Sequence, residues 1–256
     1  MITFKPKGLI FDLDDTLVNN KELAGNGLHE RSRLMAVHEI GAARGIKSLA
    51  NYSAEANAHA FRRAKLQTIE STFWYILIDA GVVSPDAIES PDHELVIEMT
   101  ARKHDLHDLL IREELEALPY VQDFLQIYAN QGMPLAIAST AIARHIDSAL
   151  SKTGLAQYFP PQRRISYEMV TRPKPDPQVY DLAFRTLRLP EADRSHTCAF
   201  DDDPRGIAAA RAAGLFVCGI ATRHSREELL SLPIPPHIAA DSYVDYADIF
   251  DIDIAR

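Results

Sequence analysis

The stretch Phe11-Asp12-Leu13-Asp14-Asp15-Thr16-Leu17 decides how the rest of the chain is interpreted. It places three carboxylates within four residues, directly after the apolar run Gly8-Leu9-Ile10-Phe11. Residues 7–13 are therefore predicted to form a buried strand. Carboxylates at the end of such a strand need a cation or a proton, because an unpaired carboxylate is costly to desolvate. Taken alone, the stretch is equally compatible with an acidic turn, since aspartate is common in turns.

The composition is that of an ordinary globular chain of 256 residues, with 46% hydrophobic and 25% charged residues. This length allows one large domain or two smaller ones. The formal net charge of −9 argues against a nucleic-acid partner and against binding to an anionic membrane surface, both of which require a basic surface. A small anionic substrate remains compatible, because a local lysine and a bound metal can reverse the field of one pocket.

Features that report on the cellular compartment favour the cytoplasm. Cys198 and Cys218 lie in apolar runs and form no short metal-type pair, which favours buried, reduced thiols. The apolar segment near the N-terminus is broken by Asp12 and Asp14 and is too short for a secretory signal. No apolar stretch is long enough to span a membrane, so we expect a cytoplasmic protein without a membrane partner.

Helical patterns dominate from about residue 20 to residue 118. We expect helices over roughly 21–44, 53–80 and 90–110, the first two ending at Gly45 and Gly81 and the third beginning at Ser90-Pro91. An apolar stripe in the second helix consists of Phe61, Leu66, Ile69, Phe73 and Ile76. His104 and His107 share one helical face without an evident third ligand, and we expect them to be solvated.

After Leu118-Pro119 the pattern alternates between helix and strand. Further strands are expected at 134–138, 196–200 and 215–220 and, more weakly, at 242–244; helices are expected at 121–130, 142–150, 178–187 and 205–213. Strands separated by helices of this size pair in parallel. The predicted fold is therefore α/β: a doubly wound parallel-sheet (Rossmann-like) core of residues 1–17 plus 118–256, with residues 18–117 inserted as a helical domain.

Chemically active residues follow these strands. Ser139-Thr140 follows the strand at 134–138, and Asp201-Asp202-Asp203 follows the strand at 196–200. Between them, the proline-rich loop 171–177 presents Lys174. Ligands of an open doubly wound sheet bind beyond the carboxyl ends of its strands, so these groups and the first acidic stretch are expected to converge. The combination suits magnesium and phosphate together.

These four segments, in this order, resemble the haloacid dehalogenase-like (HAD) superfamily of aspartate-nucleophile phosphotransferases, which inserts an α-helical cap where this chain has its helical block. The resemblance implies that Asp12 is the nucleophile and forms an aspartyl-phosphate, and that Asp14 is the general acid and base. It also implies Mg2+ as cofactor, held by Asp12, the backbone carbonyl of Asp14, and Asp202.

The resemblance further implies that Ser139 and Lys174 bind the phosphoryl oxygens and that Lys174 keeps Asp12 ionised. Thr140 is a further phosphate-binding candidate, at a position where the family usually has asparagine. Each assignment has an alternative: Ser139 or Thr140 could cap the following helix, and Lys174 could be a surface lysine. The prolines beside Lys174 favour the functional interpretation, because they limit the entropy lost on binding.

The chain also departs from the family pattern in its acidic segments. Asp15 stands where glycine is common, and Asp201-Asp202-Asp203 replaces Gly-Asp-Ser or Glu-Asp-Ser. Asp202 takes the principal metal position, and Asp201 is a candidate for direct or water-mediated metal contact. Asp203, before Pro204, is expected to cap the next helix.

The presence of both Asp12 and Asp14 indicates phosphoester chemistry, because a leaving alkoxide needs a proton. The leading hypothesis is a phosphatase acting on a small phosphorylated metabolite, similar to phosphoglycolate phosphatase. The alternatives are a sugar-phosphate mutase related to β-phosphoglucomutase, which Asp15 weakly disfavours, and a catalytically idle binding module. Arg62, Arg63 and Lys65 are candidate substrate contacts, although each is compatible with a solvated helix face. The sequence indicates neither the substrate nor the oligomeric state.

Overall fold

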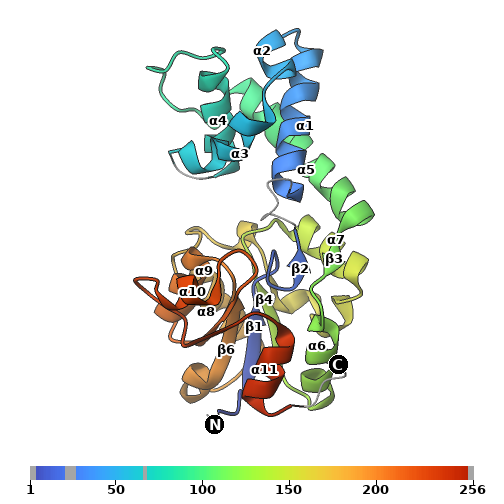
Figure 1. Cartoon of the computed structure of the whole chain (residues 1–256), viewed down its shortest axis with the longest axis vertical. Helices are drawn as coiled ribbons and strands as arrows, with labels where there is room; N and C mark the ends of the chain where they lie inside the picture. The colour runs from blue at the N-terminus through green and yellow to red at the C-terminus, as the bar shows by residue number, and fades with distance from the viewer. Residues whose placement is uncertain (1–3, 21–26, 66–67, 253–256) are drawn as a thin grey trace. The chain divides into compact units, whose positions relative to one another are not determined.

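The computed structural model describes residues 4–20, 27–65 and 68–252 and divides the chain into two compact units (Figure 1). The α/β unit contains residues 1–20 and 115–256, and the helical unit contains residues 21–114. The divisions fall after residues 20 and 114, where the sequence suggested 17 and 117. The three-residue differences arise because β2 (Val18–Asn19) and β3 (Glu116–Ala117) pair with each other and stay with the α/β unit.

Six of the described strands form one parallel sheet in the order β5-β4-β1-β6-β7-β8. The strands are β1 (Gly8–Phe11), β4 (Leu135–Ala138), β5 (Arg164–Ile165), β6 (Thr197–Asp201), β7 (Phe216–Ile220) and β8 (Ile238–Ala240). Every residue of β1, β4 and β6 is buried, as expected when helices cover both faces of a parallel sheet. The predicted α/β fold class is confirmed.

Helices lie on both sides of this sheet (Figure 1). They are α6 (Val121–Asn130), α7 (Ala143–Thr153), α8 (Gln178–Leu187), α9 (Pro204–Ala212), α10 (Arg226–Leu230) and α11 (Tyr243–Phe250), with short 3-10 turns at Ala156–Tyr158, Pro161–Arg163, Tyr167–Met169 and Glu191–His196. Ile10 belongs to the core formed with α8 and α9, whereas the adjacent Phe11 packs among aromatic rings that include Phe200 and Tyr243. Successive residues of β1 thus serve opposite faces.

The register of the central strands brings the chemically active residues level with one another. Phe11 pairs with Ile137 of β4 on one side and with Phe200 of β6 on the other. All three strands run in the same direction, so their carboxyl ends share one edge. Asp12, Ser139 and Asp201 therefore occupy neighbouring strand ends.

One strand prediction in this unit is wrong. Residues 242–244 begin α11, and Ser242 caps this helix by accepting a hydrogen bond from the Asp245 amide at 3.3 Å. The edge strand is instead β8, at 238–240. Tyr243 and Val244 have high strand propensity, but the preceding serine is a favoured N-cap and starts a helix here.

The helical unit contains α1 (Leu28–Ala43), α2 (Lys47–Ala50), α3 (Ala54–Arg63), α4 (Ile69–Asp79) and α5 (Glu94–Glu114). Its core is aliphatic and aromatic, with Val37, Phe73, Ile76, Val96 and Met99 all fully buried. Gly45 and Gly81 follow helix ends with φ of 69° and 68°, as the sequence predicted. None of the described helices has the length and apolarity needed to cross a membrane.

Helix boundaries in this unit differ from the predictions. The expected helix at 53–80 is two helices, because Ala64 has extended backbone and Thr68 begins α4 by accepting a hydrogen bond from the Ser71 amide at 3.2 Å. Phe61, expected in the apolar stripe, is 39% exposed, while Leu66 and the start of the helix expected from residue 21 lie outside the described residues. The third helix begins at Glu94 and not at Ser90, whose carbonyl accepts a turn hydrogen bond from His93.

The expectation of solvated histidines is wrong for His107. Its side chain is 1% exposed and its ring stacks on that of His29, with centroids 4.0 Å apart. His107 therefore belongs to the packing between α1 and α5.

Candidate active site

Asp12 lies at the end of β1 and is almost fully buried, with 7% exposure. Its amide donates a hydrogen bond to the Phe200 carbonyl at 2.9 Å, which continues the sheet pairing by one residue. The Lys174 ammonium donates to Asp12 Oδ1 at 2.6 Å and to Asp201 Oδ2 at 2.8 Å. Lys174 is itself only 6% exposed, so it is not a surface lysine.

The turn after Asp12 depends on a left-handed residue. Asp15 has φ of 54°, a conformation that glycine adopts without strain and aspartate tolerates better than most residues. Its Oδ1 accepts a hydrogen bond from the Asn20 amide at 2.9 Å, and its carbonyl accepts one from the Thr222 hydroxyl at 2.6 Å. These bonds provide a physical reason why aspartate can replace the family's glycine here.

Asp14 is half-buried, and Asn20 Nδ2 donates a hydrogen bond to its Oδ1. The Asp14 carboxylate does not belong to the group of converging carboxylates found among the described residues. Its side chain is thus held apart from that group by Asn20, although its charge still raises the pKa of Asp12.

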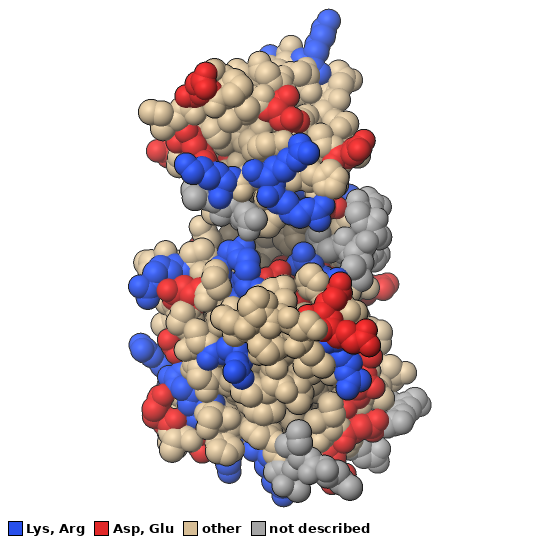
Figure 2. Space-filling view, turned by 60° about the vertical axis from the view of Figure 1, so that its left-hand side comes forward, with Lys and Arg blue, Asp and Glu red and all other residues tan. Residues whose placement is uncertain are grey.

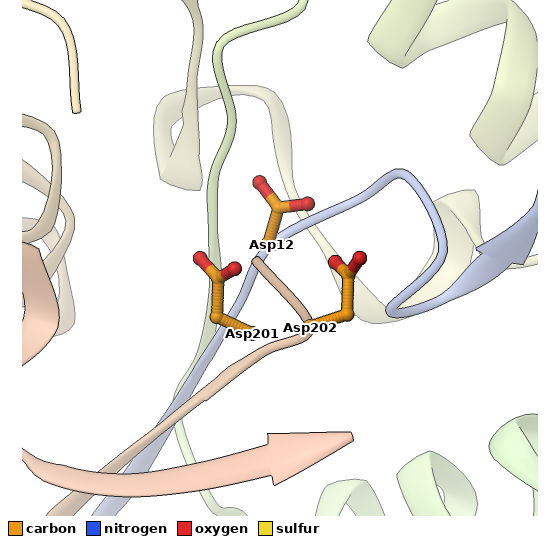
Figure 3. Close-up of side chains that lie close together, drawn as sticks. All are labelled: Asp12, Asp201 and Asp202. Atoms are coloured by element: carbon orange, nitrogen blue, oxygen red, sulfur yellow. The ribbon is translucent and has the colours of Figure 1, made fainter. Parts of the chain in front are cut away.

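Asp12, Asp201 and Asp202 each direct a carboxylate to one place, and one oxygen from each lies within 4.8 Å of the others. Figure 3 shows the Asp201 and Asp202 side chains to either side of Asp12. Thr16 Oγ1 donates a hydrogen bond to Asp202 Oδ1 at 3.0 Å. Asp202 Oδ2 is buried and accepts no hydrogen bond from the described residues; the nearest cation is Arg223, whose Nε lies 3.9 Å away.

The electrostatics of this group favour a bound proton or a further cation. Burial raises the pKa of Asp12 to about 8; the charge of Lys174 opposes this rise, and the charges of Asp201 and Asp14 add to it. Burial, followed by the charges of Asp201 and Asp12, raises the pKa of Asp202 well above its ordinary value. An unbonded buried carboxylate oxygen and an all-oxygen donor set both fit a hard divalent cation such as Mg2+.

Ser139 follows β4 and does not cap the next helix. Its Oγ accepts a hydrogen bond from the Ala141 amide at 3.0 Å, while α7 begins later and its first amide, that of Ala143, donates to the Glu168 carboxylate at 3.1 Å. A hydroxyl that accepts can still donate its own hydrogen. Thr140 is exposed and also lies before the cap position, which Ile142 occupies.

Asp203 caps α9, accepting a hydrogen bond from the Arg205 amide at 2.8 Å, as expected. Asn20, Thr222 and Arg223 were missed in the sequence. Thr222 and Arg223 follow the predicted strand at 215–220, so the same strand-end rule would have selected them had it been applied there. Asn20 carried no comparable signal.

Residues 6–214 match the family model of haloacid dehalogenase-like hydrolases, and the chain belongs to this family. The family resemblance drawn from the sequence is thereby confirmed, and with it the assignment of the chain as a hydrolase.

Curated relatives include phosphatases. Validoxylamine A 7'-phosphate phosphatase of Streptomyces hygroscopicus subsp. limoneus is 34% identical over 97 residues, which is 38% of this chain and 43% of that protein. Pyrophosphatase PpaX of Oceanobacillus iheyensis is 27% identical over 56% of this chain and 63% of its own length. Protein CbbY of Rhodobacter capsulatus is 25% identical over 86% of this chain and 87% of its own length. The match to the first of these thus spans less than half of that relative.

Solved structures share the fold over nearly the whole chain. A HAD hydrolase of family IA, variant 3, from Entamoeba histolytica superposes with a TM-score of 0.73 at 19% identity, covering 96% of this chain and 98% of its own. CbbY from Rhodobacter sphaeroides, solved in complex with phosphate, has a TM-score of 0.70 at 20% identity and covers 94% of this chain and 96% of its own.

The charged surface differs between the two units. On the face presented in Figure 2, most Lys and Arg side chains of the helical unit gather in one group, whereas those of the α/β unit are interspersed with Asp and Glu. Arg62, Arg63 and Lys65 at the end of α3 are all exposed. Arg63 also donates a hydrogen bond to the Tyr75 hydroxyl at 3.1 Å.

Proposed function

We propose that this chain is a Mg2+-dependent phosphatase that hydrolyses a small-molecule phosphomonoester through an aspartyl-phosphate on Asp12. The observation that carries the proposal is the buried Asp12 carboxylate, held 2.6 Å from the Lys174 ammonium and beside the open oxygen of Asp202. The names of two relatives, validoxylamine A 7'-phosphate phosphatase and pyrophosphatase PpaX, support phosphoryl transfer to water.

The proposed reaction has two steps. An Asp12 carboxylate oxygen attacks phosphorus, the bond to the leaving oxygen breaks, and Asp14 gives its proton to the departing alkoxide. Asp14 then takes a proton from water as that water attacks phosphorus, and the bond to Asp12 breaks to release phosphate. Dividing one difficult displacement into two easier ones is the usual advantage of covalent catalysis.

Positive charge and hydrogen-bond donors would hold the phosphoryl group. Lys174 lies beside Asp12, where it can neutralise phosphoryl oxygens and keep the nucleophile ionised. Ser139 would donate its hydroxyl from the adjacent strand end, with Thr140 as an additional donor. Asp12, the backbone carbonyl of Asp14 and Asp202 would hold Mg2+. The bound ion would offset the buried carboxylates and stabilise charge on the phosphoryl oxygens.

The division of labour between the units is also proposed. The α/β unit, residues 1–20 plus 115–256, would form the catalytic core, and the helical unit the cap that selects the substrate, with Arg62, Arg63 and Lys65 as candidate contacts. A small phosphorylated metabolite is the proposed substrate class. The cytoplasm is the proposed compartment, supported by the free, buried Cys198 and Cys218.

Magnesium-dependent hydrolysis of a chromogenic aryl phosphate tests this proposal. We expect activity with Mg2+, its loss in EDTA, and its loss in Asp12→Asn. Asp79→Asn, which alters the acceptor of the Tyr52 hydroxyl in the helical unit, is the matched control and is expected to retain activity. Conversion of a hexose 1-phosphate to the 6-phosphate without phosphate release would instead identify a mutase. Absence of activity with any phosphoester would favour the idle binding module.

A further inference from the structure

The Asp201 carboxylate is occupied by donors from the protein itself. Its Oδ2 accepts hydrogen bonds from the Lys174 ammonium at 2.8 Å and from the Tyr180 hydroxyl, and its Oδ1 accepts one from the Asp203 amide at 2.9 Å. An ionised carboxylate offers about four acceptor positions, so these three donors use most of them. The side chain has no solvent exposure.

The backbone of α9 also closes around Asp201. A Cβ atom built on Gly206 would overlap the Asp201 carboxylate group. Glycine is therefore required at this position for the helix to approach so closely. Asp201 is thus held by side chains on one side and by helix backbone on the other.

Asp202, the next residue, has the opposite environment. It accepts one hydrogen bond, from Thr16, and its Oδ2 accepts none from the described residues although it is buried. Both oxygens of Asp201 accept hydrogen bonds, whereas Asp202 Oδ2 has, among the described residues, only the Arg223 guanidinium 3.9 Å away and keeps its lone pairs for a metal.

Tyr180 of α8 supports Lys174 in two ways. Its hydroxyl donates to the same Asp201 oxygen that accepts from the ammonium, and Lys174 Nζ lies 5.0 Å from the centroid of its ring, within range of a cation–π interaction. Burial, then the charges of Asp201 and Asp12, raise the pKa of Tyr180 well above its ordinary value, so the phenol stays protonated and remains a donor. Tyr180 has no solvent exposure.

We infer that Asp201 and Tyr180 are positioning residues that fix the Lys174 ammonium beside Asp12, and that Asp201 is not a ligand of the metal although it lies within the three-carboxylate group. The part that concerns Lys174 rests on the proposed phosphatase function. The part that concerns the metal rests only on the donors around each carboxylate.

Calorimetric titration of the whole chain with Mg2+ separates the two carboxylates without requiring catalysis. Asp202→Asn removes an open ligand oxygen and is expected to weaken Mg2+ binding by about 100-fold or more. Asp201→Asn removes charge near the site but no ligand, and its effect on the dissociation constant is expected to be at least about tenfold smaller. If the loss of Mg2+ affinity in Asp201→Asn is within about tenfold of the loss in Asp202→Asn, Asp201 is a ligand and the inference is overturned.

Tyr180→Phe tests whether Tyr180 positions Lys174. It provides this test even if Asp201→Asn does not fold. This variant keeps the ring and loses only the hydroxyl. We expect kcat to fall about tenfold while KM and the Mg2+ dissociation constant each change less than about twofold. The matched control is Tyr246→Phe, which removes an equally buried hydroxyl that donates to the Gly219 carbonyl, and it should leave kcat unchanged. Unchanged kcat in Tyr180→Phe, or weakened Mg2+ binding, would contradict the positioning role.

The outcomes also separate this inference from the proposed function. If the native chain binds Mg2+ with the predicted difference between Asp201→Asn and Asp202→Asn but hydrolyses no phosphoester, the proposed function fails and the metal assignment stands. If it hydrolyses phosphoesters and the difference is absent, only the inference fails.

Discussion

The α/β unit and the helical unit each bury a lysine to the same extent, and the two lysines have different surroundings. Lys174 and Lys103 are both 6% exposed. Lys174 touches two carboxylates at a shared strand edge, whereas Lys103 Nζ lies 3.2 Å from His29 Nδ1 in the packing between α1 and α5. Both lysines are buried, so burial does not distinguish them; we expect the catalytic site at the carboxyl edge of the parallel sheet, where several charged groups converge.

Replacing each lysine by methionine should produce the largest difference in activity between the two units. Lys174→Met removes a donor to the phosphoryl group and the partner of Asp12, so we expect phosphatase activity to fall about 1000-fold. Lys103→Met is expected to change thermal stability while leaving kcat within about twofold of the native value. Steady-state kinetics with an aryl phosphate and thermal unfolding in Mg2+ measure both. Equal losses of activity in the two variants would remove the distinction between the units.

Two glycines offer the next contrast. Alanine at Gly206 would overlap the Asp201 carboxylate, and alanine at Gly41 would lie 2.7 Å from the Leu49 backbone between α1 and α2. Both substitutions overpack, at a cost of about 1–3 kcal/mol in the free energy of unfolding. Gly206→Ala should in addition lower kcat about tenfold or more by displacing Asp201 and hence Lys174. Gly41→Ala should lower the Tm and leave the kcat of the folded protein unchanged, which differential scanning fluorimetry and kinetics can verify.

The pH dependence of stability should come from the α/β unit. The pKa of Asp12 is raised in the folded chain to about 8, above its ordinary 3.8, so without metal the folded state binds a proton that the unfolded state has lost. Its contribution to stability is therefore greatest at low pH and declines as pH rises toward 8. Mg2+ competes with that proton, so its affinity should increase over the same range and level off above it.

Thermal unfolding and Mg2+ titration at pH 5, 7 and 9 measure these trends, and Asp12→Asn should reduce the pH dependence of stability measured without metal. Magnesium affinity that is constant between pH 5 and 8 in the native chain would show that the Asp12 proton does not compete with the metal.

Helix caps provide the smallest expected effect. Ser53 caps α3 and Ser242 caps α11, each through a hydrogen bond from a backbone amide, at 3.1 Å and 3.3 Å. Replacing either by alanine should cost about 1 kcal/mol in the free energy of unfolding. We expect neither change to affect kcat, because each hydroxyl serves a helix cap. Chemical denaturation of the two variants measures the loss of unfolding free energy. A lower kcat in one variant only would show that the capped helix of that unit contributes to catalysis.

The two units also differ in how much of them the sequence predicts. In the α/β unit, short apolar runs bounded by Gly, Pro or Asp define the strands, and the strand-end rule selects Asp12, Ser139 and Asp202. The strand at 238–240 was missed because only three residues form it at the sheet edge. In the helical unit, the break between α3 and α4 depends on the Thr68 cap, a local hydrogen bond that competes with a continuous helical pattern.

Residues that support the site were harder to find. Tyr180 lies in the first turn of the amphipathic helix α8, where an aromatic residue is expected to pack in the core, and nothing in the sequence reveals that its hydroxyl reaches Asp201. Asn20 precedes the helical insertion and contacts Asp14 only because the turn at Asp15 is left-handed. Both contacts are set by tertiary geometry, which neither periodicity nor spacing contains.

Trapping the phosphorylated chain tests the role of Asp12 most directly. In Asp14→Asn an aryl phosphate can still transfer its phosphoryl group, because an aryl leaving group needs little protonation, whereas water activation is impaired. After acid quench, mass spectrometry of the peptide that contains Asp12 should show the added mass of one phosphoryl group, and the double variant with Asp12→Asn should not. Phosphate release by the native chain, without a phosphorylated Asp12 peptide in Asp14→Asn, would contradict nucleophilic catalysis by this residue.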